Sequence, residues 1–173
     1  MLKIYILSLM VLTGLTSQAQ MKIAIPEIGV VQELENDSLL VECGFRYLVE
    51  STPKILSPRN VSDQDFQDQL QTIKNLQTPL YACNLFIPGD LKAVGPNVDE
   101  KAVLDYVEIV LRRAQAAGLT LITWGSGGSR RVPEGFSRIK AKEQFIELAR
   151  KVAEIAERYN IILALENLNS TEC

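Results

Sequence analysis

Glu166 and the polar residues after it look like the start of an active site. Glu166 follows five apolar residues, 161–165, and opens the spacing Glu-x-x-Asn-x-x-Glu that Asn169 and Glu172 complete. A charged carboxylate left unpaired at the end of a buried strand would cost several kcal/mol. Glu166 is therefore expected to meet a metal ion, a polar partner or water. A solvated strand end is the alternative interpretation, because loops commonly begin with polar residues.

The composition limits the chemistry that is available. The 173 residues include no histidine, which removes the commonest general base and metal ligand. Cys43, Cys83 and Cys173 lack the close spacing of a disulfide framework or a zinc site, and the first two are expected to be small buried residues. The formal charge of −3 argues against a nucleic-acid surface, which would carry a basic stripe. Any catalysis must therefore use carboxylates, lysine, tyrosine or cysteine.

The first residues have the three parts of a secretory signal peptide. Lys3 gives a positive start, residues 4–15 form an apolar run, and residues 17–19 supply a small-x-small cleavage pattern. The run is shorter than the roughly 20 residues that cross a bilayer. We expect a signal peptide over residues 1–19 and an exported, periplasmic domain over residues 20–173, with no stable membrane insertion after cleavage. An N-terminal anchor or a core helix is the alternative.

Apolar runs that alternate with amphipathic stretches must position the candidate residues, and this alternation is typical of a parallel α/β sheet. Strands are predicted over residues 22–25, 47–51, 80–86, 119–124 and 161–166. Four helices are predicted between the strands, the first of them near residues 37–43. Residues that commonly stand at helix ends mark the boundaries: Gly44, Ser62, Asn97 with Glu100, Ser137 and Asn160.

The loops differ in length according to which end of a strand they follow. Links from strand to helix are long, at residues 52–61, 87–96 and 125–136, whereas residues 117–118 and 159–160 suffice to return from helix to strand. Long loops after strands carry the sites of (β/α) proteins. Repeats of about 30 to 40 residues fit a (β/α)8 TIM barrel, which needs about 250 residues. We therefore predict an incomplete barrel rather than a doubly wound sheet, which would show a glycine-rich fingerprint after its first strand.

Three segments carry a resemblance to a known family: Tyr-Ala-Cys-Asn-Leu-Phe at 81–86, Trp-Gly-Ser-Gly-Gly at 124–128 and Leu-Glu-Asn-Leu-Asn-Ser-Thr-Glu at 165–172. With these segments the chain resembles the xylose isomerase-like TIM barrels. That family includes sugar isomerases, ketose 3-epimerases, inosose dehydratases and endonuclease IV-type nucleases. The resemblance covers residues 21–173 and corresponds to the first five-eighths of the family's barrel, so a C-terminally truncated domain is expected.

The resemblance implies roles for the residues of the last segment. Glu166 would bind a divalent metal and transfer a proton, while Asn169 and Glu172 would lie near the substrate hydroxyls. Proton transfer beside a carbonyl needs a base close to that carbon and a metal that holds the oxygens, and hard oxygen ligands suit Mg²⁺ or Mn²⁺. The family's other ligands, an Asp, a His and a Glu on strands six to eight, have no counterpart here. This chain is therefore expected to be inactive by itself.

Three more residues at or near the ends of predicted strands are candidate sugar contacts. Trp124, the single tryptophan, would stack on an apolar sugar face or fill the barrel. Glu50 would reach the same mouth as Glu166 or form a solvated strand end. Asn84 would bond sugar hydroxyls or form a turn. The glycines and two arginines at 125–131 would approach an anion or form a flexible turn, the simpler account because their spacing matches no phosphate motif.

The leading hypothesis is an exported sugar isomerase or epimerase that binds a small sugar. A lyase or dehydratase acting on an oxidised sugar uses the same proton abstraction. A non-catalytic carbohydrate-binding protein or a gene remnant is the alternative from another class. The nuclease branch of the family is the third hypothesis. It would need a basic groove and several histidines, and the sequence shows neither. Unpaired edges at strands 22–25 and 161–166 predict association into homo-oligomers.

Overall fold

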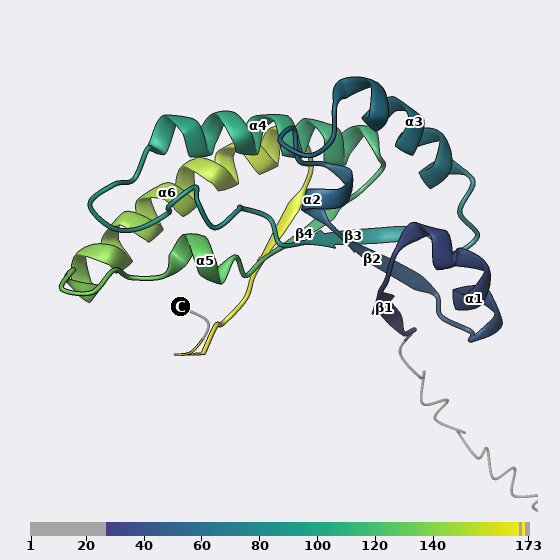
Figure 1. The fold of residues 1–173 in the computed structure, drawn as a ribbon, viewed down its shortest axis with the longest axis horizontal. Coiled ribbons are helices and arrows are strands. Elements are labelled where there is room, and N and C mark those ends of the chain that lie inside the picture. The colour runs from purple at the N-terminus through teal and green to yellow at the C-terminus, as the bar shows by residue number, and fades with distance from the viewer. Residues whose placement is uncertain (1–26, 170, 172–173) are drawn as a thin grey trace, which may run out of the picture.

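The computed structural model describes residues 27–169 and Thr171, which form one curved parallel sheet with helices along one side (Figure 1). The strands are β1 (Gly29–Val31), β2 (Tyr47–Ser51), β3 (Leu80–Asn84), β4 (Leu121–Trp124) and β5 (Ile162–Leu165). They are hydrogen-bonded in the order β1-β2-β3-β4-β5, and every pair is parallel. This order is that of consecutive units in a TIM barrel, so the predicted α/β class and the incomplete barrel are confirmed.

Helices and caps follow the sequence pattern closely. The structure contains α1 (Asp37–Glu42), α2 (Thr52–Ile55), α3 (Asp63–Lys74), α4 (Glu100–Ala116), α5 (Gly127–Arg130), α6 (Arg138–Arg158) and the 3-10 turn η1 (Leu34–Asn36). The side chain of Ser62 accepts a hydrogen bond from the Asp65 amide at 3.1 Å, as an N-cap should. Ser137 caps α6 in the same way. Gly44 adopts a left-handed φ of 78° after α1, as expected.

Four details differ from the sequence prediction. The first described strand is Gly29–Val31, where no strand was predicted. The predicted strand at 22–25, the signal peptide at 1–19 and Glu172 lie outside the described residues. Asp99, not Asn97, caps α4, because its side chain accepts from the Ala102 amide at 2.9 Å. The long loops contain the one-turn helices α2 and α5. Cys43 is exposed, because it ends a helix whose only buried residue is Leu40.

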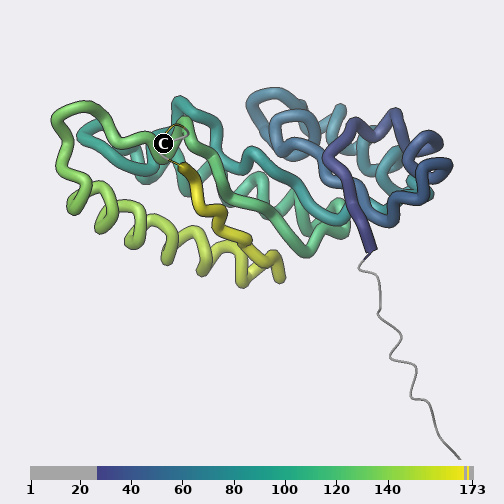
Figure 2. The backbone as a smooth tube through the Cα atoms, turned by 90° about the horizontal axis from the view of Figure 1, so that it is seen from below, coloured from purple at the N-terminus to yellow at the C-terminus, as the bar shows by residue number. Residues whose placement is uncertain are grey.

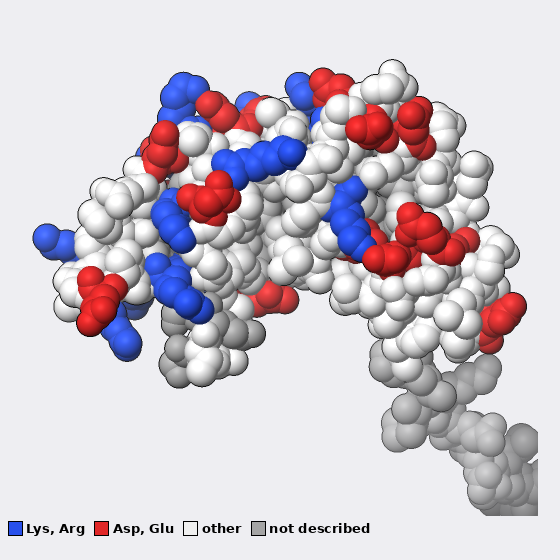
Figure 3. All heavy atoms as spheres, in the orientation of Figure 1, with Lys and Arg blue, Asp and Glu red and all other residues white. Residues whose placement is uncertain are grey.

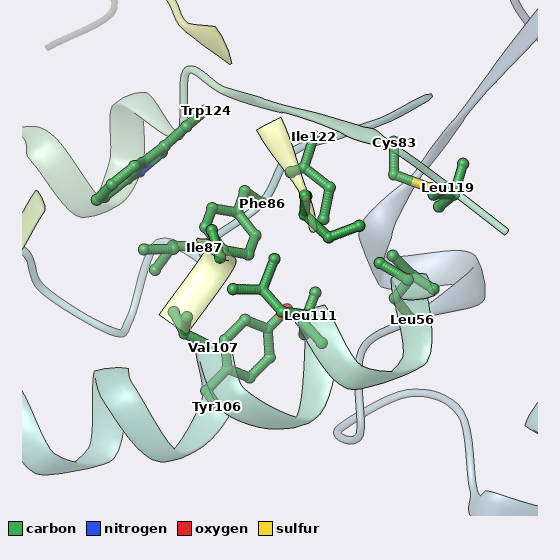
Figure 4. Packing of buried hydrophobic residues seen from close by; sticks show 14 of the residues in the cluster. Leu56, Cys83, Phe86, Ile87, Tyr106, Val107, Leu111, Leu119, Ile122 and Trp124 are labelled. Carbon is green, nitrogen blue, oxygen red and sulfur yellow. The ribbon is translucent and has the colours of Figure 1, made fainter. Parts of the chain in front are cut away.

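The hydrophobic core lies between the sheet and its helices, on what we call the outer face of the sheet (Figure 4). Ile122 is fully buried on β4 and packs in the same cluster as Val107 and Leu111 of α4. Phe86, after β3, contributes an aromatic ring to this layer. Since α4 and α6 carry their apolar residues on one stripe each, the two longest helices both cover this face (Figure 1).

The opposite, inner face of the sheet is uncovered in the described chain. Side chains alternate along each strand, so neighbours of buried outer residues point inward. Val31, Tyr81 and Ile162 are 59%, 47% and 66% exposed, although all three are large and apolar. Figure 2 shows β1 and β5 at opposite edges of the sheet, and Figure 3 shows the arch beneath it, with charged side chains over the outer helices. The inner face would be the interior of a closed barrel.

Candidate functional site

Glu166 lies at the carboxyl edge of the sheet and belongs to its inner face. The register pairs Trp124 of β4 with Leu165 of β5, so Glu166 follows beside Gly125. Its amide donates to the carbonyl oxygen of Trp124 at 3.2 Å, and this bond extends the ladder by one step. The residue is exposed. The structure therefore presents a carboxylate at the edge where (β/α) barrels place their chemistry.

Asn84 shares this edge. Asn84 ends β3 opposite Ser51 of β2, one step beyond the buried pair of Cys83 and Glu50, so alternation turns Asn84 toward the inner face. Its Oδ1 atom is buried and has no hydrogen-bond partner in the described structure. The acceptor is unsatisfied, but its burial keeps it out of reach of a donor from solvent until the side chain turns.

Glu50 lies on the outer face, away from Glu166. It is 5% exposed, and its Oε1 accepts from the Ser51 amide at 2.6 Å. Its side chain lines a hollow of about 550 Å³ between β2, α2 and α3, together with Lys54 and Gln69. The two strand-end carboxylates predicted to share one mouth are therefore separated by the sheet. Glu50 was predicted either to reach the same barrel mouth as Glu166 or to be a solvated strand end, and its buried position on the outer face fits neither prediction.

Trp124 also points to the outer face. The indole is 2% exposed and packs edge-on against Phe86 at 5.7 Å and Phe145 at 5.2 Å between ring centroids. Figure 4 shows it within the layer between the sheet and the helices. Trp124 therefore packs in the outer layer and not inside the barrel, so neither predicted place, the sugar face or the barrel interior, describes it.

Asn169 lies just after the candidate base and is exposed. Its Oδ1 accepts from the Thr171 amide at 2.9 Å, which is an Asx-type turn. Asn169 and Leu168 line a hollow of about 610 Å³ with Arg130 and Phe145. Asn169 is thus near the carboxyl edge, while its predicted neighbour Glu172 lies outside the described residues.

The glycine- and arginine-containing segment at 125–131 uses its backbone groups for internal bonds. Ser126 has a left-handed φ of 50°, and its hydroxyl oxygen accepts from the Ile87 amide at 2.9 Å. The amides of Ser129 and Arg130 both donate to the Ser126 carbonyl oxygen. These groups hold a junction between two loops. The segment is therefore a turn, but an internally bonded one rather than the predicted flexible one, and the amides involved are not directed at an anion.

The described residues do not assemble a metal centre. Within 27–169 and Thr171, no group of three or more His, Cys, Asp or Glu side chains is placed to hold an ion. Glu166 is the single predicted ligand among them. Cys83 offers no thiolate, because burial, with a smaller contribution from the nearby Glu50 carboxylate, raises the pKa of its thiol far above the ordinary value.

Two residues with unusual backbone conformation were not predicted. Leu85 directly follows β3 with a φ of 52° and is 57% exposed, and Ser126 follows β4 in the same left-handed region. Non-glycine residues adopt this region rarely and often near functional edges. No sequence signal marks Leu85, because leucine is an unfavourable residue for this conformation. For Ser126, the surrounding glycines were the only local sign of a tight turn.

A parallel α/β sheet whose long loops and acidic strand end share one edge defines a TIM-barrel type of protein. The sequence profile of the xylose isomerase-like TIM barrels matches residues 38–173. The chain belongs to this family. No curated protein sequence matches the chain significantly.

Solved structures show the same fold. The 3-keto-D-glucoside 4-epimerase YcjR from E. coli is 17% identical, with a TM-score of 0.62 over 83% of this chain and 56% of its own. The D-psicose 3-epimerase from Clostridium cellulolyticum H10 is 16% identical, with a TM-score of 0.67 over 84% of this chain and 53% of its own. The IOLI protein with a bound zinc atom is 15% identical, with a TM-score of 0.57 over 81% and 51%. The chain thus spans about half the length of these structures.

Proposed function

We propose that the chain is the first five-strand part of an exported sugar isomerase or epimerase in which Glu166 transfers a proton beside a sugar carbonyl. The observation that carries the proposal is the placement of Glu166: it is exposed, on the inner face, at the carboxyl edge, and anchored through its amide to β4. A positioned carboxylate of this kind can take a proton from one face of a carbon and return it.

The proposed site needs groups from outside the described residues. In a complete barrel a divalent metal, Mg²⁺ or Mn²⁺, would bind Glu166 and stabilise negative charge on the sugar oxygens. The remaining ligands would come from later strands, so the chain by itself would be inactive. The two epimerases among the solved structures support the sugar substrate, and the zinc atom in the IOLI structure supports a divalent metal. Asn84 would bond a sugar hydroxyl after a turn of its side chain, because its unpartnered Oδ1 is buried in the described structure.

The test compares three proteins in a version extended by the coding sequence downstream of Cys173. Ketoses and keto-glycosides are assayed with Mg²⁺, Mn²⁺ and Zn²⁺ for the extended wild type, Glu166→Gln and Glu143→Gln. Glu143 is an exposed glutamate of α6 and serves as the matched control. We expect Glu166→Gln to lose at least about 100-fold in kcat, which is typical of a general base. Unchanged turnover in Glu166→Gln would overturn the proposal.

A non-catalytic carbohydrate-binding protein or a gene remnant is the second candidate. It is favoured by the fact that the described residues lack a metal-binding group. A stop codon directly after Cys173, together with sugar binding that does not respond to metal, would support this candidate. Release of water from an oxidised sugar in the same assay would instead identify a lyase, since the proton abstraction is shared.

A further inference from the structure

The space for the Glu166 carboxylate exists because residue 125 has no side chain. A Cβ atom added to Gly125 would collide with Oε2 of Glu166 and lie 3.3 Å from its Cδ. The same atom would lie 3.5 Å from Cδ2 of Leu168, which is ordinary contact. Gly125 does not have the positive φ that would demand glycine for conformational reasons, unlike Gly118 or Gly135. A Cβ at residue 125 would therefore push the Glu166 carboxylate, the end of an exposed side chain, out of its present place, and glycine lets it stay there.

The backbone of Glu166 is held by a second residue, Arg130. One guanidinium nitrogen, Nη1, donates to the carbonyl oxygens of Trp124, Gly125 and Glu166 at 3.4, 3.1 and 3.0 Å. The guanidinium carbon lies 4.7 Å from the centroid of the Phe145 ring, which fixes the plane of the group. Since the Glu166 amide already donates to Trp124, both backbone polar groups of Glu166 are tied to the end of β4.

We propose that Gly125 and Arg130 are positioning residues that fix the place of the Glu166 carboxylate. Gly125 provides the space in which the carboxylate lies, and Arg130 locks the ends of β4 and β5 at one register. This inference rests on the proposed role of Glu166 for its catalytic meaning, although the geometry stands without it. A displacement of about 1 Å in a reacting group can cost 100-fold in rate. A proton-transfer carboxylate on the last described strand would need such support.

The first test fills the space beside residue 125 that the Glu166 carboxylate occupies. Gly125→Ala is compared with Gly89→Ala in the chain with isotope-labelled glutamate. Gly89 is the matched control, because its added Cβ would meet only backbone atoms of Gly128, at 3.4 Å or more. We expect the NOE between the Glu166 γ protons and the α proton of residue 125 to be lost in Gly125→Ala and kept in Gly89→Ala. If the NOE persists in Gly125→Ala, the role of Gly125 is wrong.

The second test removes the hydrogen bonds from Arg130 to the backbone around Glu166. It can be carried out even if Gly125→Ala fails to fold. Amide hydrogen exchange at Glu166 is measured for Arg130→Met, Arg130→Lys and Arg150→Met. Arg150 is exposed on α6 and serves as the control. We expect exchange to accelerate at least about tenfold in Arg130→Met, partly recover in Arg130→Lys, and stay unchanged in Arg150→Met, as local opening of one tethered segment would give. Unchanged exchange in Arg130→Met would overturn the role of Arg130.

The activity assay of the extended protein separates this inference from the proposed function. If both are right, Gly125→Ala and Arg130→Met lower kcat with little change in KM, whereas Gly89→Ala does not. If the NOE and the exchange change as expected but turnover does not, the positioning is right and the catalytic role of Glu166 is wrong. If neither NOE nor exchange changes, the positioning is wrong whatever the activity.

Discussion

The two faces of the sheet treat the same residue type in opposite ways. Glu50 and Glu166 both stand at the ends of predicted strands, yet Glu50 is buried on the outer face and Glu166 is exposed on the inner face. One residue of register separates these outcomes, because successive side chains of a strand point to opposite faces. The outer face is part of the packed core, whereas the inner face exposes large apolar side chains in the described chain. Stability should therefore depend on the outer face, and chemistry and association on the inner face.

The largest expected effect is on association through the inner face. We expect residues 20–173 to form dimers or larger assemblies, because two features favour contact between chains. Apolar side chains are exposed on the inner face, and the edges of β1 and β5 are unpaired among the described strands. The double change Val31→Lys with Ile162→Lys should shift the mass measured by light scattering toward the monomer. Ile139→Lys, on the exposed side of α6, is the control. A monodisperse wild-type monomer would contradict this prediction.

The next largest expected effect is on the free energy of unfolding, through packing on the outer face. Ile122→Ala should lower the free energy of unfolding by about 2–5 kcal/mol, because it opens a cavity in a fully buried site. Ile162→Ala, one strand away on the inner face, should change it by no more than about 0.5 kcal/mol, as exposed positions do. Urea denaturation of both variants measures the difference. Equal losses would mean that the inner face is also packed in solution.

The sequence predicts the elements well because their signals are local. Ser62 and Ser137 cap the helices that the apolar spacing indicates, and Gly44 has its left-handed conformation, since each depends on a few neighbouring residues. The strand at 47–51 was placed to the residue. Short turns such as α2 and α5 have too few residues for a periodic pattern, and they were missed.

The orientation of strand-end residues could not be predicted in the same way. Leu48 and Val49 are both apolar, so the sequence does not say which of them faces the helices, nor therefore which way Glu50 turns. The register between β2 and β3 also shifts between Leu48 and Val49, which no local pattern reveals. Trp124 was expected near the loops from its position, but pairing with Leu165 turns it into the core.

A smaller effect on stability is expected when the two carboxylates, Glu50 and Glu166, are replaced. Glu50→Ala should destabilise the fold by about 1–3 kcal/mol, because it leaves the Ser51 amide without its acceptor. Glu50→Gln keeps an acceptor oxygen and should retain most of the stability, and Glu166→Ala should leave the urea midpoint unchanged. If Glu50→Ala instead stabilises the protein, the cost of burying the carboxylate exceeds the value of its bond to the Ser51 amide, and the prediction is wrong.

The smallest effect depends on pH and concerns the outer layer. The hydrogen bond from Arg113, together with its charge, holds the pKa of Asp63 below its ordinary value, and Arg113 is itself buried. A lowered folded-state pKa stabilises the protein above the unfolded-state pKa, and this stabilisation disappears as the pH falls through the folded-state value. The urea midpoint of Asp63→Asn should thus lie slightly below wild type at pH 7 and converge with it in acid.

Asp68→Asn, on the same helix, is the matched control for the removal of one acidic side chain. A gap between Asp63→Asn and wild type that stays constant down to pH 3 would show that the bond to Arg113 acts through shape rather than charge. Either result bears on the contrast between the faces, because Arg113 also donates to the carbonyl oxygens of Leu56 and Val61 and so joins α4 to the loop after β2. At the inner edge, by contrast, Arg130 donates to the backbone carbonyl oxygens of Trp124, Gly125 and Glu166. Because these acceptors carry no charge to lose, the contacts of Arg130 should not weaken as the pH falls.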